Sequence, residues 1–145
     1  MRKFKVGPFM PIGDGGFILS TTSPRIQATY GYNREVALLA EDLGMDFLFS
    51  MIKYRGIGVE SDFWHRCLES FTLISALAEC TKKVELIGSM NILTVPPAVA
   101  AKMAVTIDHV SNGRFGVNIV TGGFPTEIKQ MHLWTGTHDG RYDQA

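Results

Sequence analysis

Residues 97–123 read PAVAAKMAVTIDHVSNGRFGVNIVTGG, a helical pattern followed by a short turn and a strand pattern. The apolar residues that share one helical face are Val99, Met103, Ile107 and Val110. A proline opens the pattern, where its missing N–H costs a helix nothing, and Ser-Asn-Gly at 111–113 is a typical helix end. Residues 114–120 are mostly apolar in succession, as in a strand covered on both faces. The stretch predicts a helix over 97–110 that leads into a buried parallel strand.

The same alternation recurs through the rest of the chain. Other apolar runs of strand length are residues 4–9, 46–50 and 84–88, and other helical patterns are residues 33–43 and 70–80. Asn33 is the expected N-cap of the first helix, and Gly44 is its expected end. Strands and helices in this order imply parallel strands joined by right-handed crossovers. The predicted fold class is therefore α/β.

Residues 141–145 have the pattern of a fourth helix that has only begun. Four strands with three and a half helices are half of an eight-unit barrel, and a closed barrel of this kind takes about 250 residues. We therefore expect residues 1–145 to form one domain, the N-terminal half of a TIM (β/α)8 barrel, and to be a fragment of a longer chain.

Composition excludes several classes of protein. Charged residues make up 19% of the chain and hydrophobic ones 46%, and 14 Lys and Arg balance 14 Asp and Glu. This balance argues against nucleic acid or an anionic membrane as a partner, because both select a basic surface. Cys67 and Cys80 lie far apart, and neither they nor the four histidines have metal-ligand spacing. We expect a cytoplasmic protein without a metal site.

The connections differ in length at the two ends of the predicted strands. Helices return to strands through a few residues, whereas the segments that lead from strands into helices are long: residues 11–32, 51–69, 89–96 and 121 onward. Ligand sites in α/β folds lie at this end of the strands. Residues 13–16 read GDGG but lack the GxGxxG spacing, so we interpret the first long segment as a loop that covers a ligand.

Polar residues stand out at this end of the sheet. Asn118 lies inside an apolar run, where its amide must find partners, and it is either a structural bridge or a ligand contact. Lys53 and Arg55 follow the second predicted strand and are candidates to bind an anionic or carbonyl-bearing substrate. The same face receives Glu127, Arg141 and Tyr142, of which the last two suit a phosphate group.

Several motifs resemble one known family. They are Pro11-Ile12-Gly13, Ser50-Met51-Ile52-Lys53, Arg55-Gly56, Phe63-Trp64, Leu68-Glu69-Ser70-Phe71-Thr72-Leu73, Pro96-Pro97-Ala98, the Asn-Gly-Arg-Phe-Gly-Val-Asn-Ile-Val-Thr-Gly of residues 112–122, and Arg141-Tyr142-Asp143. Together they resemble the bacterial luciferase-like, FMN-dependent monooxygenases, and within them the pyrimidine monooxygenase branch of the Rut uracil-degradation pathway.

The resemblance implies a TIM barrel enzyme that uses reduced FMN and O2. It implies a separate NAD(P)H-dependent flavin reductase as the source of reduced FMN, and a small organic substrate such as the pyrimidine uracil, whose ring is opened. We also expect a homo-oligomer. The residues that the resemblance assigns to FMN are Ile52, Lys53, Asn118, Glu127, Arg141 and Tyr142. Ser89 and Asn118 correspond to residues that hold oxygen near the flavin, and a serine keeps the required hydroxyl donor.

Two alternatives remain open from the sequence. One is an F420-dependent oxidoreductase of the same superfamily, which transfers hydride without oxygen. The other is a non-catalytic flavin-binding barrel protein. The motifs at 51–53 and 118–122 favour the FMN monooxygenase.

Overall fold

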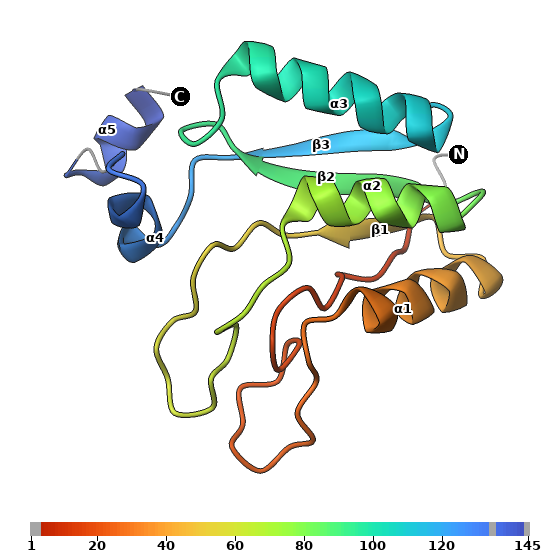
Figure 1. Ribbon diagram of the computed structural model, residues 1–145, viewed down its shortest axis with the longest axis horizontal. Helices are drawn as coiled ribbons and strands as arrows, with labels where there is room; N and C mark the ends of the chain where they lie inside the picture. Colours follow the sequence, from red (N-terminus) through yellow and green to blue (C-terminus); the bar gives the residue numbers. More distant parts are fainter. Residues whose placement is uncertain (1–3, 134–135, 144–145) are drawn as a thin grey trace.

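The computed structural model describes residues 4–133 and 136–143, which fold around one parallel sheet (Figure 1). Its elements, in chain order, are α1 (Tyr30–Asp42), β1 (Phe47–Ser50), α2 (Ser70–Cys80), β2 (Glu85–Asn91), α3 (Pro97–Ser111), β3 (Phe115–Val120), α4 (Pro125–Gln130) and α5 (His138–Asp143). The strands lie in the order β1-β2-β3, and both pairings are parallel. The α/β prediction, with parallel strands alternating with helices, is confirmed.

All three strands point the same way, so their carboxyl ends share one edge of the sheet. Ser50 pairs in register with Gly88, and Asn91 pairs with Val120. Figure 1 shows α4 and α5 beside this edge, where the arrowheads of the strands point. The chain therefore places its two short helices where the sequence predicts the ligand site.

The strand predicted over residues 4–9 is wrong in extent. The segment runs beside β1, but the structure gives it a single parallel bridge, Phe9 to Phe49. Two features stop the ladder from extending toward the N-terminus. Pro8 has no N–H to donate, and Val6 donates its N–H to a side-chain carboxylate instead of to a neighbouring strand.

The helix predictions differ from the structure mainly at the ends. The helix predicted over 70–80 has the predicted bounds. The first helix begins at Tyr30, because Thr29 caps it by accepting a hydrogen bond from the N–H of Tyr32. Asn33 is therefore not the N-cap that we predicted. Its buried amide lies inside α1 and donates to the carbonyl of Pro11.

The C-terminal helices were predicted less well. The fourth helix was expected from residue 141, whereas α5 begins at His138, and residues 144–145 of the prediction lie outside the described residues. The short helix α4 was not predicted, since six residues are too few for a periodic pattern.

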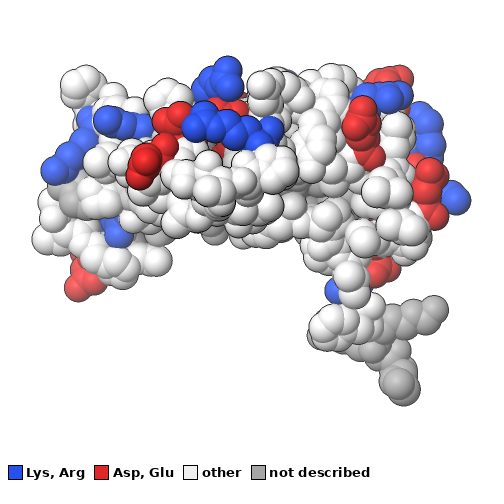
Figure 2. Space-filling model, turned by 90° about the horizontal axis from the view of Figure 1, so that it is seen from below, with Lys and Arg blue, Asp and Glu red and all other residues white. Residues whose placement is uncertain are grey.

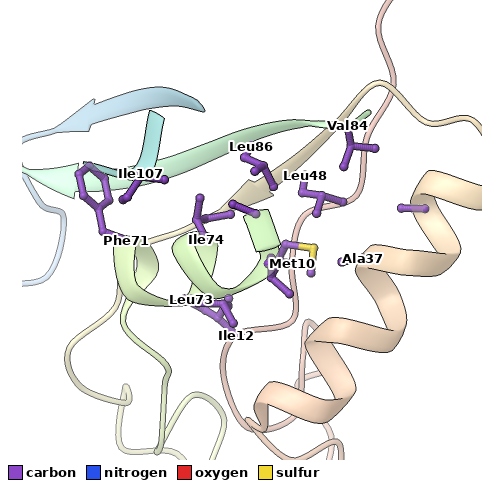
Figure 3. Packing of buried hydrophobic residues seen from close by; sticks show 13 residues of the cluster. Met10, Ile12, Ala37, Leu48, Phe71, Leu73, Ile74, Val84, Leu86 and Ile107 are labelled. Carbon is purple, nitrogen blue, oxygen red and sulfur yellow. The ribbon is translucent and has the colours of Figure 1, made fainter. Parts of the chain in front are cut away.

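The core lies between the sheet and the helices α1 and α2, with α3 completing it at one end (Figure 3). Its fully buried members include Met10, Leu48, Ile74, Leu77 and Leu86. The buried face predicted for the first helix is Val36, Leu39, Ala40 and Leu43, and it is partly wrong. Ala40 is buried as predicted, but Leu39 is 59% exposed and Leu43, just past the end of α1, is 65% exposed, while Ala37 faces the core instead.

The charges on the surface are mixed. In Figure 2, basic and acidic residues lie next to one another on the face shown, with uncharged surface between the groups. Among the described residues, no helix is both long enough and apolar enough to cross a lipid bilayer.

Candidate active site

A cavity of about 510 Å³ opens at the carboxyl ends of the strands. Its walls combine aromatic and aliphatic side chains with a few polar groups. The lining residues are Phe9, Phe49, Met51, Ile52, Tyr54, Ser89, Asn91, Asn118, Ile119, Val120, Thr121, Gly122, Gly123, Phe124, Glu127 and Tyr142. Five of the predicted site residues therefore share one cavity: Ile52, Ser89, Asn118, Glu127 and Tyr142. Lys53 and Arg141 lie behind its walls.

Asn118 and Ser89 form a polar pair in this otherwise apolar part of the cavity. They are register partners on β3 and β2, and the Nδ2 of Asn118 donates to the Oγ of Ser89 over 2.9 Å. Because Ser89 Oγ accepts this bond, the serine keeps its own proton for donation. The amide of Asn118 is thus a bridge between strands that also faces the cavity, and its contact with a ligand stays a prediction.

A buried serine network fixes the backbone beneath this pair. Ser70 Oγ accepts a hydrogen bond from the N–H of Ser89 over 2.9 Å, and it donates toward Ser50, whose Oγ lies 3.0 Å away. Ser70 is the first residue of α2, so this helix start is tied to the ends of both β1 and β2. The position of Ser89 is therefore set by three elements.

Lys53 and Glu127 form a buried ion pair that joins α4 to the segment after β1. Lys53 Nζ lies 3.0 Å from Glu127 Oε1, and the two side chains are only 3% and 8% exposed. The same oxygen accepts the backbone N–H groups of Tyr54, over 2.9 Å, and Arg55, over 3.1 Å. Glu127 therefore holds the cavity wall that contains Tyr54, while the side chain of Arg55 is exposed and lies outside the cavity lining.

The Lys53 ammonium also lies over an aromatic ring. Its Nζ is 3.3 Å from the centre of the Phe124 ring, a cation–π contact at short range. With a carboxylate on one side and a ring on the other, this cation is directed into the protein. Lys53 is not among the residues that line the cavity, and its contact with FMN stays a prediction.

Arg141 and Tyr142 approach the cavity from α5. Arg141 is nearly buried, and its Nη1 donates to the carbonyl of Gly122 over 2.6 Å. Tyr142 is more exposed and lines the cavity itself. Arg141 thus lies beside the Gly122-Gly123 bend, and Tyr142 and the bend line the same cavity.

Tyr54 and Asn91 are cavity residues that the sequence reading missed. Tyr54 Oη lies 3.1 Å from Thr94 Oγ1, and burial raises the pKa of this phenol, so Tyr54 stays neutral. Asn91 was missed because the predicted strand ended at residue 88, whereas β2 continues to Asn91. Residues two apart in a strand lie on the same face, so the spacing of Ser89 and Asn91 could have identified Asn91 as a cavity residue.

A family model described as luciferase-like monooxygenase matches residues 4–145. The chain belongs to the luciferase-like monooxygenase family. Curated relatives include pyrimidine monooxygenases RutA from Pseudomonas savastanoi pv. phaseolicola, 48% identical over 90% of this chain, and from Caulobacter vibrioides, 48% identical over 91%. The chain spans 36% and 37% of the length of these two relatives.

Solved structures of several other proteins share the fold. A long-chain alkane monooxygenase is 25% identical, with a TM-score of 0.77 over 99% of this chain and 36% of that one. An EDTA monooxygenase from Chelativorans sp. BNC1 has a TM-score of 0.83 at 17% identity, over 99% of this chain and 34% of that one. The oxygenating constituent of 3,6-diketocamphane monooxygenase from Pseudomonas putida, solved in complex with FMN, has a TM-score of 0.67 at 19% identity, over 79% of this chain and 30% of that one. The three-stranded sheet is therefore a partial luciferase-like barrel.

Proposed function

We propose that this chain carries the flavin and oxygen site of an FMN-dependent monooxygenase whose substrate is a pyrimidine such as uracil. The observation that carries the proposal is the pair Asn118–Ser89, a donor and a hydroxyl held 2.9 Å apart in the wall of the cavity. Curated relatives at 48% identity that are named pyrimidine monooxygenases support the substrate class.

The residues present fit FMN. The aromatic side chains of Phe9 and Phe49 offer an apolar surface to a flat ring system. At the Gly122-Gly123 bend the backbone is bare, and a side chain at Gly123 would enter open space beside the cavity. Arg141 is bonded to this bend and Tyr142 lines the same cavity, and a hydroxyl with a guanidinium suits a phosphate group. The cavity wall thus offers an apolar surface for the flavin ring and polar groups for the phosphate.

In this proposal the polar pair positions oxygen. Reduced FMN, when bound, supplies the two electrons with which one atom of O2 is reduced to water while the other atom enters the substrate. Ser89 Oγ has a proton to donate, and the Asn118 side chain keeps one N–H beyond the bond to Ser89. These donors hold oxygen in place, and the surrounding apolar side chains exclude water from it.

The partners follow from the same chemistry. An enzyme that consumes reduced FMN needs a separate source of it, and we propose an NAD(P)H-dependent flavin reductase. Ile52 and Asn118 are the proposed flavin contacts on the strand side of the cavity. Glu127 and Lys53 support that wall by holding α4 against it.

The test is reconstitution with isotopically labelled oxygen. Purified protein is mixed with FMN, a flavin reductase, NADH, uracil and labelled O2, and the products are analysed by mass spectrometry. We expect a ring-opened product with one labelled oxygen atom. Flavin oxidation without a labelled product would overturn the substrate, and absence of FMN binding would overturn the proposal. Turnover with reduced F420 in the absence of oxygen would instead establish the hydride-transfer alternative.

A further inference from the structure

Asn91 occupies the last position of β2 and lines the cavity, yet it is only 2% exposed. Its Oδ1 accepts the N–H of Leu93 over 3.0 Å, and its backbone carbonyl accepts the hydroxyl of Thr94 over 2.8 Å. Both the main chain and the side chain of Asn91 are therefore fixed by the turn that follows the strand. The remaining group, the amide NH2, points to the neighbouring strand end.

Gly122 is the residue that this amide meets. Gly122 has a φ of +79°, and a Cβ there would lie 2.6 Å from Asn91 Nδ2 and 3.0 Å from Ile128 Cδ1. The Asn91 amide thus lies directly against the backbone of the bend, at a distance that excludes any side chain on Gly122. Asn91 and Val120 are register partners, so the contact belongs to the end of the β2-β3 pairing.

The carbonyl of Gly122 accepts the hydrogen bond from Arg141 Nη1 over 2.6 Å. The direction of the Gly122 carbonyl depends on the backbone torsion angles of the bend. The Asn91 side-chain amide, which packs against Gly122, restricts these angles. A continuous set of contacts therefore runs from the turn at 91–94 through Asn91 and Gly122 to the Arg141 guanidinium.

We propose that Asn91 is a positioning residue for Arg141: it holds the Gly122 bend so that the guanidinium meets the phosphate of FMN. This inference rests on the proposed function, because it takes FMN as the ligand. Asn91 makes no contact with the phosphate in this account and acts only through the bend. A neutral amide suits the position, since a carboxylate there would stand close to the phosphate and repel it.

The distinction between FMN and riboflavin provides the test, because riboflavin has the same ring system without the phosphate. Binding of both flavins to the purified protein is measured by fluorescence titration for wild type, Asn91→Ala and Arg141→Ala. We expect Asn91→Ala to weaken FMN about tenfold, as for one lost charge-assisted contact, and to leave riboflavin nearly unchanged. Because both residues serve one contact, adding Asn91→Ala to Arg141→Ala should cause little further loss.

Asn112→Ala is the matched control. Asn112 ends α3 in a left-handed conformation at the opposite end of β3, so its replacement strains the fold without reaching the cavity. The ratio of FMN to riboflavin affinity should stay at the wild-type value in this variant. If Asn91→Ala does not fold, Asn91→Ser keeps a polar, neutral side chain but lacks the amide that packs against Gly122, and it should also lower the ratio.

The outcomes separate the inference from the proposed function. Equal weakening of both flavins by the Asn91 variants would mean a general structural role and would overturn the inference, as would an unchanged ratio. In either case wild-type binding of FMN would leave the proposed function standing. Failure of the wild-type protein to bind either flavin would overturn both.

Discussion

Asn118 donates from Nδ2 to the Oγ of Ser89, its register partner on the adjacent strand, over 2.9 Å. This bond holds the amide of Asn118 against the neighbouring strand, and it leaves Ser89 Oγ with its own proton to donate. A buried amide that bridges two strands and also lines a cavity is rigid, and rigid donors suit a small ligand such as O2.

Loss of either partner should uncouple oxygen use from product formation. In Asn118→Ala and Ser89→Ala we expect reduced flavin to be oxidised with a lower yield of product, while FMN affinity changes far less, because the loss falls on the reacting complex. The effects of the two substitutions should be non-additive, since the residues serve one molecule.

Stopped-flow oxidation of the reduced-flavin complex, with product counted per flavin oxidised, measures this effect. A wild-type product yield in both variants would contradict the role of Asn118 and Ser89 in positioning oxygen. Asn118 would then serve only as a bridge between the two strands.

The buried pair Lys53–Glu127 should contribute strongly to stability. Lys53→Met leaves a carboxylate in a site where it is 8% exposed, and removing one partner of such a pair costs about 3–5 kcal/mol. The double variant Lys53→Met/Glu127→Gln should recover part of this loss, because no unpaired charge remains. Urea unfolding measures the free energies.

The exposed pair Arg25–Asp62 is the matched control for this prediction. Its side chains are 68% and 57% exposed, so Asp62→Asn should change stability by less than about 1 kcal/mol. If breaking either pair lowered the free energy of unfolding equally, burial would not explain the strength of the Lys53–Glu127 pair.

Glu41 should make stability depend on pH. Its carboxylate accepts the backbone N–H groups of Lys82, Lys83 and Val84. Partial burial opposes its ionisation, but the hydrogen bonds from Lys83 and Lys82 outweigh this and lower the pKa of Glu41 from its ordinary value of 4.5. A lowered folded-state pKa stabilises the protein above the ordinary value, and this stabilisation is lost as the pH falls through the folded-state pKa.

Melting temperatures of wild type and Glu41→Gln should therefore differ near neutral pH and converge as the pH falls through the lowered folded-state pKa of Glu41. The exposed residue Glu35, on the same helix, supplies the control Glu35→Gln, which should melt like wild type near neutral pH. A difference for Glu41→Gln that persists unchanged in acid would assign its effect to packing.

The 145-residue chain by itself should associate. We propose that it is one domain that needs further structure beside β3, because Ile119 is 63% and Val117 40% exposed and β2 is the only strand paired with β3 among the described residues. An unpaired apolar edge promotes association. Sedimentation should show species that change with concentration. A monomer that melts cooperatively at low concentration would contradict this.

The sequence by itself determined the alternation of helices and strands and the end of the sheet that carries the site. The periodic residues of α2 predict its bounds correctly because its burial repeats with the period of a helix. The amide of Asn118 was found because a polar residue inside an apolar strand needs a partner wherever the strand lies. Both signals depend on residues that are close together in the sequence, so the sequence alone reveals them.

Only the tertiary structure decided which residues meet. The register of β2 and β3 places Ser89 opposite Asn118, and the end of the same pairing puts Asn91 beside Gly122. The direction of the Lys53 side chain depends on its buried ion pair with Glu127 of α4. This helix is too short to show a period in the sequence. These contacts join residues far apart in the chain. Local periodicity carries no information about them, because strand register and helix docking are set by packing of the whole sheet.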